Sequence, residues 1–242
     1  IMLVSELVKE FGFNEIEKYM HAIQKNASDT VKKTLKIVAH QLMQSQDNLS
    51  GDSDNDVAIF ESSDFMDDGT KICLKITLDP ANEKFTFDFT GTTPQVYGNL
   101  NAPEAITFSA TLYVLRCLVN EEIPLNQGCL DPVDIIIPVG SVLSPRQGAA
   151  VVGGNVMTSQ RVTDVILKAS GVQADSQGDC NNLTFGNDNF GYYETICGGH
   201  GAGCFYWRKL PGQDESQVAW NGTSAVHTNM TNTRMTDVEI FE

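Results

Sequence analysis

The sequence is short of basic residues and carries neither an export nor a membrane-spanning pattern. Its 242 residues include 16 Lys and Arg against 31 Asp and Glu, a formal net charge of −15. Nucleic acids and anionic membranes are bound through basic surfaces, so this balance argues against both as partners. No run of eighteen apolar residues predicts a transmembrane helix. No charged start followed by an apolar core marks a signal peptide, and we expect a cytoplasmic protein.

Paired cysteines and short histidine spacings are also missing. The six cysteines are scattered without a Cys-x-x-Cys pair, which argues against a zinc site and leaves reduced thiols as the expectation. His200 and His227 with Glu194, Asp237 or Glu239 would be the donor set for a metal. None of them stands at a His-x-x-x-His or Glu-x-x-His spacing, so we predict no metal on this chain.

A nucleotide-binding motif is absent as well. Residues 198–203, Gly-Gly-His-Gly-Ala-Gly, are rich in glycine but do not continue into the Gly-Lys-Ser/Thr of a P-loop. No βαβ pattern surrounds them, as a dinucleotide fingerprint requires. A loop that cradles a ligand and a tightly packed turn both remain open for this segment.

The amino-terminal part predicts helix. From Asn14 to about Gln46 apolar residues recur every three or four positions, which indicates one amphipathic helix, with Asn14 as N-cap and Glu17 as its capping partner. A helix of this length projects beyond its own domain or packs on a partner. A short helix is expected before it, ending near Gly12. We predict a helical segment over residues 1–50 and an α+β domain over 51–242.

The pattern then changes to alternation. Apolar and polar residues alternate in three stretches, which predicts an antiparallel β-meander with one apolar face against a helix layer: Val57–Glu61, Lys71–Leu78 and Phe85–Phe89. Beyond it we expect a buried strand in Val133–Ile137.

Two further helices are expected to pack on this sheet. The first begins at Pro103, capped by Asn101 or Ala102, and runs to about Val119. The second covers Thr158–Ser170. Gly153 and Gly154 just before it would expose amides to an anion, assisted by Arg161. Arg161 paired with Asp164 or a neighbouring carboxylate is the alternative. The fold class is therefore α+β, with glycine- and asparagine-rich irregular loops.

The last third holds three segments rich in Gly, Asn and Thr: Ser176–Gly186, Tyr192–Gly203 and His227–Glu239. None has the period of a helix or of a long alternating strand. Such composition fits irregular backbone that approaches a ligand closely and offers it amides and hydroxyls. Surface turns are the alternative, and an exposed hairpin tip is expected in residues 210–218.

These three segments, together with Gly98–Ala105 and Gly153–Asp164, closely resemble the carboxy-terminal part of the hydantoinase B family, within its ATP-dependent 5-oxoprolinase branch. The resemblance runs from roughly Leu3 to the end. Family members are much longer, so we expect this chain to be a fragment that is catalytically silent alone.

The resemblance implies a function for the whole protein. Such enzymes hydrolyse 5-oxo-L-proline to L-glutamate through a phosphorylated lactam. ATP and Mg²⁺ are expected on a hydantoinase A-like part, the main partner of this chain, with no cofactor on the chain itself. A homo-oligomer and a role in glutathione metabolism are also expected. The alternatives are a hydantoinase or ketone carboxylase subunit, or a non-catalytic assembly module.

We predict two groups of site residues within these segments. Glu194 and His227 are the acid/base candidates, because a carboxylate or imidazole can take a proton from a nucleophilic water. Amide, guanidinium and close backbone groups suit a lactam or carboxylate, and the predicted substrate-binding residues are Asn181, Asn182, Gly199, Gly201, Asn229, Asn232 and Arg234. A structural His227, and Arg234 held in a buried pair with Asp237 or Glu239, are the alternatives.

Overall fold

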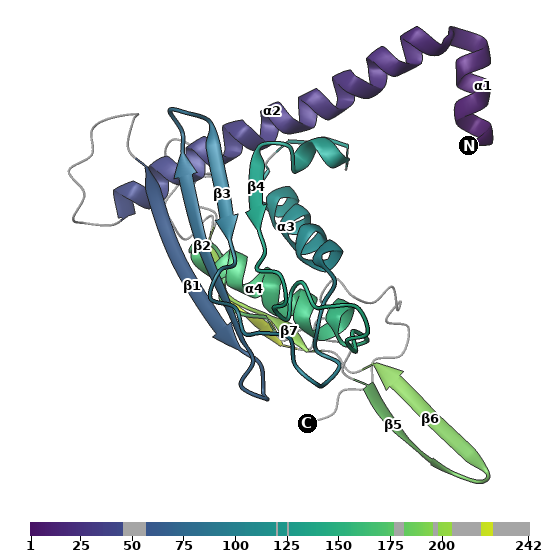
Figure 1. The fold of residues 1–242 in the computed structure, drawn as a ribbon, viewed down its shortest axis with the longest axis vertical. Helices are drawn as coiled ribbons and strands as arrows, with labels where there is room; N and C mark the ends of the chain where they lie inside the picture. The colour runs from purple at the N-terminus through teal and green to yellow at the C-terminus, as the bar shows by residue number, and fades with distance from the viewer. Residues whose placement is uncertain are drawn as a thin grey trace.

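One four-stranded sheet with helices on one of its faces forms the centre of the fold (Figure 1). The computed structural model describes residues 1–45, 57–119, 121–124, 126–176, 182–195, 198–204 and 219–224. Helices α2 and α4 contact β1 and β2, and α3 packs on α4. The predicted α+β class is confirmed, whereas the division into segments 1–50 and 51–242 stays a prediction.

The sheet has the order β1-β2-β3-β4. Strands β1 (Ala58–Phe65), β2 (Lys71–Asp79) and β3 (Lys84–Asp88) pair antiparallel, which confirms the meander. Strand β4 (Val133–Ile136) pairs parallel to β3. The strand predicted there as buried is only partly so, because β4 is the edge of the sheet and Ile136 is exposed.

Alternation in the strands builds the core. On β2 the side chains of Ile72, Leu74, Ile76 and Leu78 are buried, while those between them lie on the open face. Phe85 and Phe87 continue the same buried face on β3. Each such side chain stabilises the fold by about 1.5–3 kcal/mol. The apolar face predicted from the sequence is therefore the one that the helices cover.

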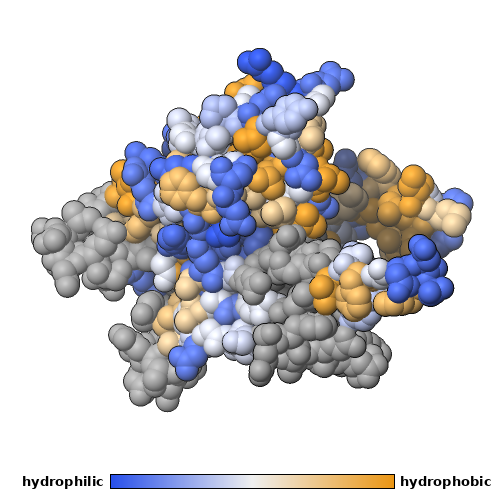
Figure 2. Space-filling model, turned by 90° about the horizontal axis from the view of Figure 1, so that it is seen from below, coloured by the Kyte–Doolittle hydropathy of each residue, from blue (hydrophilic) through white to orange (hydrophobic). Residues whose placement is uncertain are grey.

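The amino-terminal helices extend away from this core. α1 (Met2–Phe11) ends at Gly12, whose φ of 86° suits glycine, and α2 (Phe13–Ser45) follows directly. The prediction of Asn14 as N-cap is wrong, since Asn14 is already helical. Only the second half of α2 packs on the sheet. The apolar residues of α1 and of the first half of α2 are exposed, on an arm that stands apart on the right of Figure 2, far from the viewer.

The two helices behind the sheet lie where the sequence predicts them. α3 (Glu104–Leu118) has Pro103 as its N-cap, one position from the prediction, and α4 (Ser159–Ala169) follows a one-turn π-helix, η2 (Gly154–Thr158). The π-helix was not expected. A short 3-10 helix, η1 (Gln127–Cys129), precedes β4 and touches α2.

The last third contains more regular structure than its composition suggests. β5 (Asn182–Asn187) and β6 (Phe190–Thr195) form a hairpin that projects from the body (Figure 1). Irregular backbone was expected here, and that expectation is wrong. Two-residue strands complete the described part: β7 (Gly199–His200) pairs with β10 (Thr223–Ser224), and β8 (Gly203–Cys204) with β9 (Ala219–Trp220). The hairpin tip predicted in residues 210–218 lies outside the described residues.

Among the helices of the described chain, none combines the length and the apolar character needed to cross a bilayer.

Candidate functional site

Two of the glycine- and asparagine-containing segments pack directly against each other at the start of α4. The Gly153 amide donates to the Asn99 carbonyl at 2.8 Å, and the Thr158 hydroxyl donates to Leu100. A Cβ on Gly154 would lie 2.6 Å from the Asn101 carbonyl oxygen, so only glycine fits there. The Gly154 amide donates to Val151. These two glycine amides are therefore occupied, and the anion site predicted on them is not formed by them.

Asn101 fixes the loop on which η2 rests. Its side chain is fully buried and accepts from the Val96 amide at 2.9 Å. Its amide nitrogen lies 2.9 Å from the carbonyl oxygens of Val96, Gly98 and Ala150. The sequence suggested Asn101 as a helix cap. In the structure it instead joins residues 96–101 to residue 150, and so positions the turn that leads into α4.

Asp164 on α4 is the buried centre of a hydrogen-bonded network. The residue is 1% exposed, and its Oδ1 accepts from Gln160 Nε2 at 3.0 Å and from the Ser176 amide at 3.2 Å. Its Oδ2 has no hydrogen-bond partner among the described residues. Burial raises the pKa of Asp164 to about 6, because the charged form loses its hydration.

Arg161, one turn before, takes the paired arrangement that the sequence left open. Its Nη1 lies 2.8 Å from Asp64 of β1, 3.6 Å from Asp175 and 3.9 Å from Asp164. Burial alone would raise the pKa of Asp64, but hydrogen bonds from Asp175, the Phe65 amide and Arg161 together lower it to about 2. Burial and the neighbouring Asp64 raise the pKa of Asp175. One guanidinium thus lies within 4 Å of three carboxyl groups from three parts of the chain, and it is hydrogen-bonded to that of Asp64.

The same network anchors the glycine-rich strands. Ser176 Oγ accepts from the Gly201 amide at 3.1 Å, and the Ala174 amide donates to the Ala202 carbonyl at 2.8 Å. Gly201 in turn accepts from Trp220 Nε1 at 3.2 Å. Through Ser176, the segment around Gly201 is therefore tied to Asp164 on α4.

Close packing explains why this segment needs glycine. A Cβ on Gly201 would collide with the Ala174 carbonyl oxygen, and one on Gly199 would lie 2.7 Å from that of Thr223. Between the two interpretations left open for Gly198–Gly203, these contacts supply a packing reason for both glycines. Their role in binding substrate stays a prediction.

A pocket of about 290 Å³ lies between α3 and α4, at the other end of the network. Apolar groups dominate its wall, and Gln160 connects it to Asp164. Both helices contribute, and the lining residues are Ile106, Ser109, Ala110, Tyr113, Asn155, Ser159, Gln160 and Thr163. The pocket is bordered by the π-helix, and such helical bulges occur frequently at functional sites.

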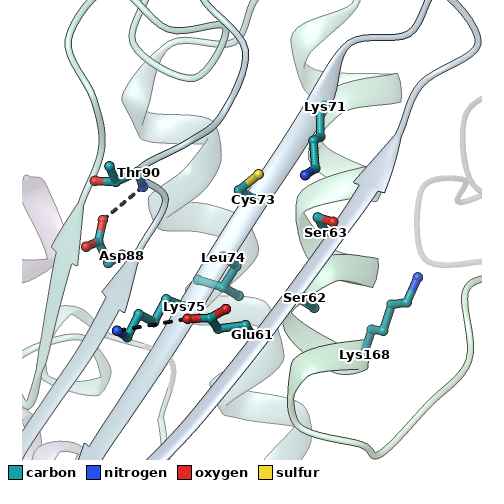
Figure 3. Close-up of a pocket in the computed structure, with 10 residues that line it drawn as sticks. All are labelled: Glu61, Ser62, Ser63, Lys71, Cys73, Leu74, Lys75, Asp88, Thr90 and Lys168. Carbon is teal, nitrogen blue, oxygen red and sulfur yellow. Dashed lines mark hydrogen bonds and ion pairs between the residues drawn. The ribbon is translucent and has the colours of Figure 1, made fainter.

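A larger hollow of about 670 Å³ opens on the uncovered face of the sheet. In Figure 3, Lys71, Cys73 and Lys75 project from β2, Asp88 and Thr90 lie at the end of β3, and Lys168 reaches past the edge of β1. Several of its charged groups already have partners. Lys75 lies 3.9 Å from Glu61, and Asp88 accepts from the Thr90 amide at 2.9 Å. We therefore regard the more apolar α3–α4 pocket as the better candidate site.

The structure describes only some of the predicted site residues. Leu183 pairs with Glu194 and Asn182 with Thr195, so the backbones of Asn182 and Glu194 lie side by side at the base of the β5–β6 hairpin. Gly199 and Gly201 lie in the strands tied to α4. Asn181, His227, Asn229, Asn232 and Arg234 lie outside the described residues, so their roles stay predictions. Within the described chain, no group of three His, Cys, Asp or Glu side chains is placed to hold a metal ion.

Sequence reasoning missed the residues that organise the site. Asp64 is one residue in an alternating strand, and nothing in its neighbourhood indicates a partner on α4. Ser159 and Gln160 were within a segment already singled out. What distinguishes them is visible only in the fold: Gln160 bonds the buried Asp164, and the Ser159 hydroxyl is buried without a partner among the described residues. The π-helix beside them is the structural signal that the sequence did not show.

The whole chain, residues 1–242, matches the family described as hydantoinase B/oxoprolinase. Among its relatives, "5-oxoprolinase 1" of Arabidopsis thaliana is 54% identical over 242 residues, which is 100% of this chain and 18% of the relative. The "5-oxoprolinase" of Saccharomyces cerevisiae is 56% identical over 221 residues, 86% of this chain and 16% of the relative. The chain thus spans less than a fifth of either curated relative.

A solved structure shares the fold. The ATP-dependent caprolactamase from Pseudomonas jessenii superposes with a TM-score of 0.62 at 16% sequence identity, over 92% of this chain and 36% of that one. At this identity the likeness shows the fold alone.

Proposed function

The chain belongs to the hydantoinase B/oxoprolinase family, and from this membership we propose that it is part of an ATP-dependent 5-oxoprolinase. The longer enzyme would hydrolyse 5-oxo-L-proline to L-glutamate. Relatives that carry this name are 54% and 56% identical to the chain, which supports this substrate over others of the family. The caprolactamase also acts on a cyclic amide, as its name states.

The observation that carries the proposal within this chain is the network around Asp164. It connects the α3–α4 pocket through Gln160 with the glycine-rich strand through Ser176. Segments 98–105 and 198–203, which resemble the family, are both tied to segment 153–164, the first by direct hydrogen bonds and the second through Ser176. Such a scaffold holds an irregular binding segment in a fixed place, which enzymes need for precise orientation of substrate.

The chemistry assigned to the whole enzyme needs activation of a poor electrophile. Opening a lactam is uphill, and ATP supplies the driving force by phosphorylating the amide oxygen. Two waters are then consumed, one to open the C–N bond and one to release phosphate. The Asn, Gly and Thr segments of this chain would line part of the enclosed substrate site, and Glu194 or His227 would take the proton of the attacking water.

The nucleotide and Mg²⁺ are assigned to a hydantoinase A-like part of the enzyme. The described residues of this chain offer no three-ligand metal cluster. Segment 198–203 also has the wrong continuation for a phosphate loop. As part of the same proposal, we expect the isolated 242 residues to be inactive. A cytoplasmic homo-oligomer that acts in glutathione metabolism is part of the same proposal.

The proposal is tested by measuring the rate of ATP hydrolysis by the longer protein with and without 5-oxoproline. The wild type is compared with the Glu194→Gln variant. Stimulation by 5-oxoproline that falls at least a hundredfold in the variant is expected, because removal of a general base costs about 10²–10⁴ in rate. Glu61→Gln, an exposed position on β1, is the control and should keep full stimulation. Stimulation that survives Glu194→Gln would move the base elsewhere, and no stimulation in wild type would remove 5-oxoproline as substrate.

Two other functions are separated by the same assay. A hydantoinase or ketone carboxylase subunit would show ATP hydrolysis stimulated by hydantoins or acetone instead. A non-catalytic assembly module is favoured by one observation, the exposed apolar arm of α1 and α2. In that case Glu194→Gln and Arg234→Gln would change the size of the assembly rather than turnover.

A further inference from the structure

The hydroxyl groups at the α3–α4 pocket differ in whether they have a hydrogen-bond partner. Ser109 Oγ donates to the Ala105 carbonyl at 2.8 Å, and Thr163 Oγ1 donates to that of Ser159 at 2.9 Å. Ser159 Oγ is buried and has no hydrogen-bond partner among the described residues. A buried hydroxyl without a partner is unfavourable, so a group that enters the pocket would be expected to accept from it.

Gln160 places a hydrogen-bond acceptor in the same pocket. Its Nε2 donates to Asp164 Oδ1 at 3.0 Å, and an ionised carboxylate can only accept. The orientation of the Gln160 side-chain amide is therefore fixed. Its Nε2 faces Asp164, and its Oε1 points away from Asp164. Ser159 and Gln160 both line the pocket, so between them they can offer a ligand one hydroxyl donor and one amide acceptor.

A donor beside an acceptor is complementary to one edge of a cyclic amide. In a small ring the amide bond is cis, so the N–H and the C=O point to the same side. A linear trans peptide presents them on opposite sides. The rest of such a ring is apolar, as are the walls that Ile106 and Ala110 provide. At about 290 Å³ the pocket is at the small end of ligand sites, which suits a single ring and is too small for a nucleotide.

We propose that the pocket between α3 and α4 binds the lactam ring, with Ser159 Oγ donating to the carbonyl oxygen and Gln160 Oε1 accepting from the ring N–H. This inference rests on the proposed function and adds the residues that recognise the amide. Among the described residues, no acidic or basic side chain lines the pocket. It therefore recognises the uncharged ring, and the carboxylate of 5-oxoproline lies outside it.

The uncharged lactam 2-pyrrolidinone is the probe that isolates this recognition. We expect it to bind the longer protein, measured by calorimetry, and to compete with 5-oxoproline in the ATPase assay. Ser159→Ala should raise its dissociation constant and the KM for 5-oxoproline about tenfold, with the KM for ATP unchanged.

The control is Ser170→Ala, because Ser170 at the carboxyl end of α4 is also buried but its hydroxyl donates to the Ile166 carbonyl at 2.9 Å. It should leave both constants unchanged. A purely structural Ser159 would lower the melting temperature when changed to Ala. The proposal predicts an equal or higher melting temperature, since a buried hydroxyl without a partner is removed.

The outcomes separate this inference from the proposed function. Turnover of 5-oxoproline with equal constants in Ser159→Ala and wild type overturns the pocket and leaves the function standing. If 5-oxoproline does not stimulate ATP hydrolysis by the wild type, the calorimetric measurement of 2-pyrrolidinone binding alone tests the pocket. Binding of 2-pyrrolidinone that is weakened only by Ser159→Ala supports the pocket. Absence of that binding in wild type overturns it, and the groove is then a packing surface for another part of the longer protein.

Discussion

At the scale of single residues, Asp164 is unusual because it is buried without a close cation. Arg161 lies 3.9 Å away and is engaged more closely by Asp64. The two hydrogen bonds that Asp164 accepts, from Gln160 and Ser176, do not offset its loss of hydration. The pKa of Asp164 is therefore raised to about 6. The residue therefore orders its neighbours at a cost in stability.

Asp164→Asn should stabilise the fold at neutral pH. The pKa rises from 3.8 unfolded to about 6 folded, so the wild type loses stability as the pH rises from about 4 to 6. Above pH 6 the loss reaches about 3 kcal/mol. An asparagine has no charge to bury and still accepts from Gln160. We expect urea unfolding to show a gain of about 1–3 kcal/mol at pH 8 and little gain at pH 4.

The control for this change is Asp134→Asn, an exposed carboxylate on β4. It should alter the unfolding free energy by less than about 0.5 kcal/mol at either pH. A loss of stability in Asp164→Asn at pH 8 would mean that the ionised carboxylate is net stabilising, contrary to the direction of its pKa.

At the scale of elements, η2 packs tightly against the loop of residues 99–102. Gly154→Ala places a methyl group 2.6 Å from the Asn101 carbonyl oxygen and 2.9 Å from Ala102 Cα. Both obstacles are backbone, so the π-helix must shift. We expect a loss of about 1–3 kcal/mol in thermal or urea unfolding, as for other overpacked sites.

Gly98→Ala is the matched control in the same loop, since its Cβ would meet nothing within 4 Å. It should be neutral within about 0.5 kcal/mol. Equal losses in the two variants would show that chain flexibility, and not contact with η2, explains the effect.

The elements with a clear period were predictable, and the contacts between them were not. The alternation of Lys71–Leu78 depends only on one buried face, and the strand lies there. The β5–β6 hairpin was missed because Asn182–Thr195 has exposed aromatic residues on a short two-stranded ribbon without a buried face. The pairing of Arg161 with Asp164, three residues apart, could be anticipated, whereas Asp64 lies 97 residues from Arg161 and no local pattern encodes that contact.

At the scale of the whole molecule, the arm of α1 and the first half of α2 is exposed to solvent. Tyr19, Met20 and Ile23 lie along it, and α1 adds Leu3, Leu7 and Phe11. Contiguous apolar surface of this kind marks sites of association. We therefore expect it to pack against another polypeptide segment or a second copy of this chain.

Met20→Lys with Ile23→Lys should weaken association of the chain. Static light scattering is expected to show concentration-dependent oligomers for wild type and a smaller species for the double variant. The new charges reduce the net charge from −15 and so lower overall repulsion. Weaker association would therefore report loss of the apolar contact. Asn14→Lys with Gln24→Lys adds the same charge at polar positions and should keep the wild-type size. Identical behaviour of both double variants would contradict a role for the apolar stripe.

The parallel pairing of β4 with β3 has a consequence for how the chain assembles. β1, β2 and β3 are joined by short turns and can close as successive hairpins, which is a fast process. β4 reaches β3 only after the chain has passed through α3, and this longer closure costs more entropy. The meander is therefore expected to form first and the strand after α3 to join it later. We therefore expect α3, which supplies one wall of the pocket, to be fixed in place only after the meander has formed.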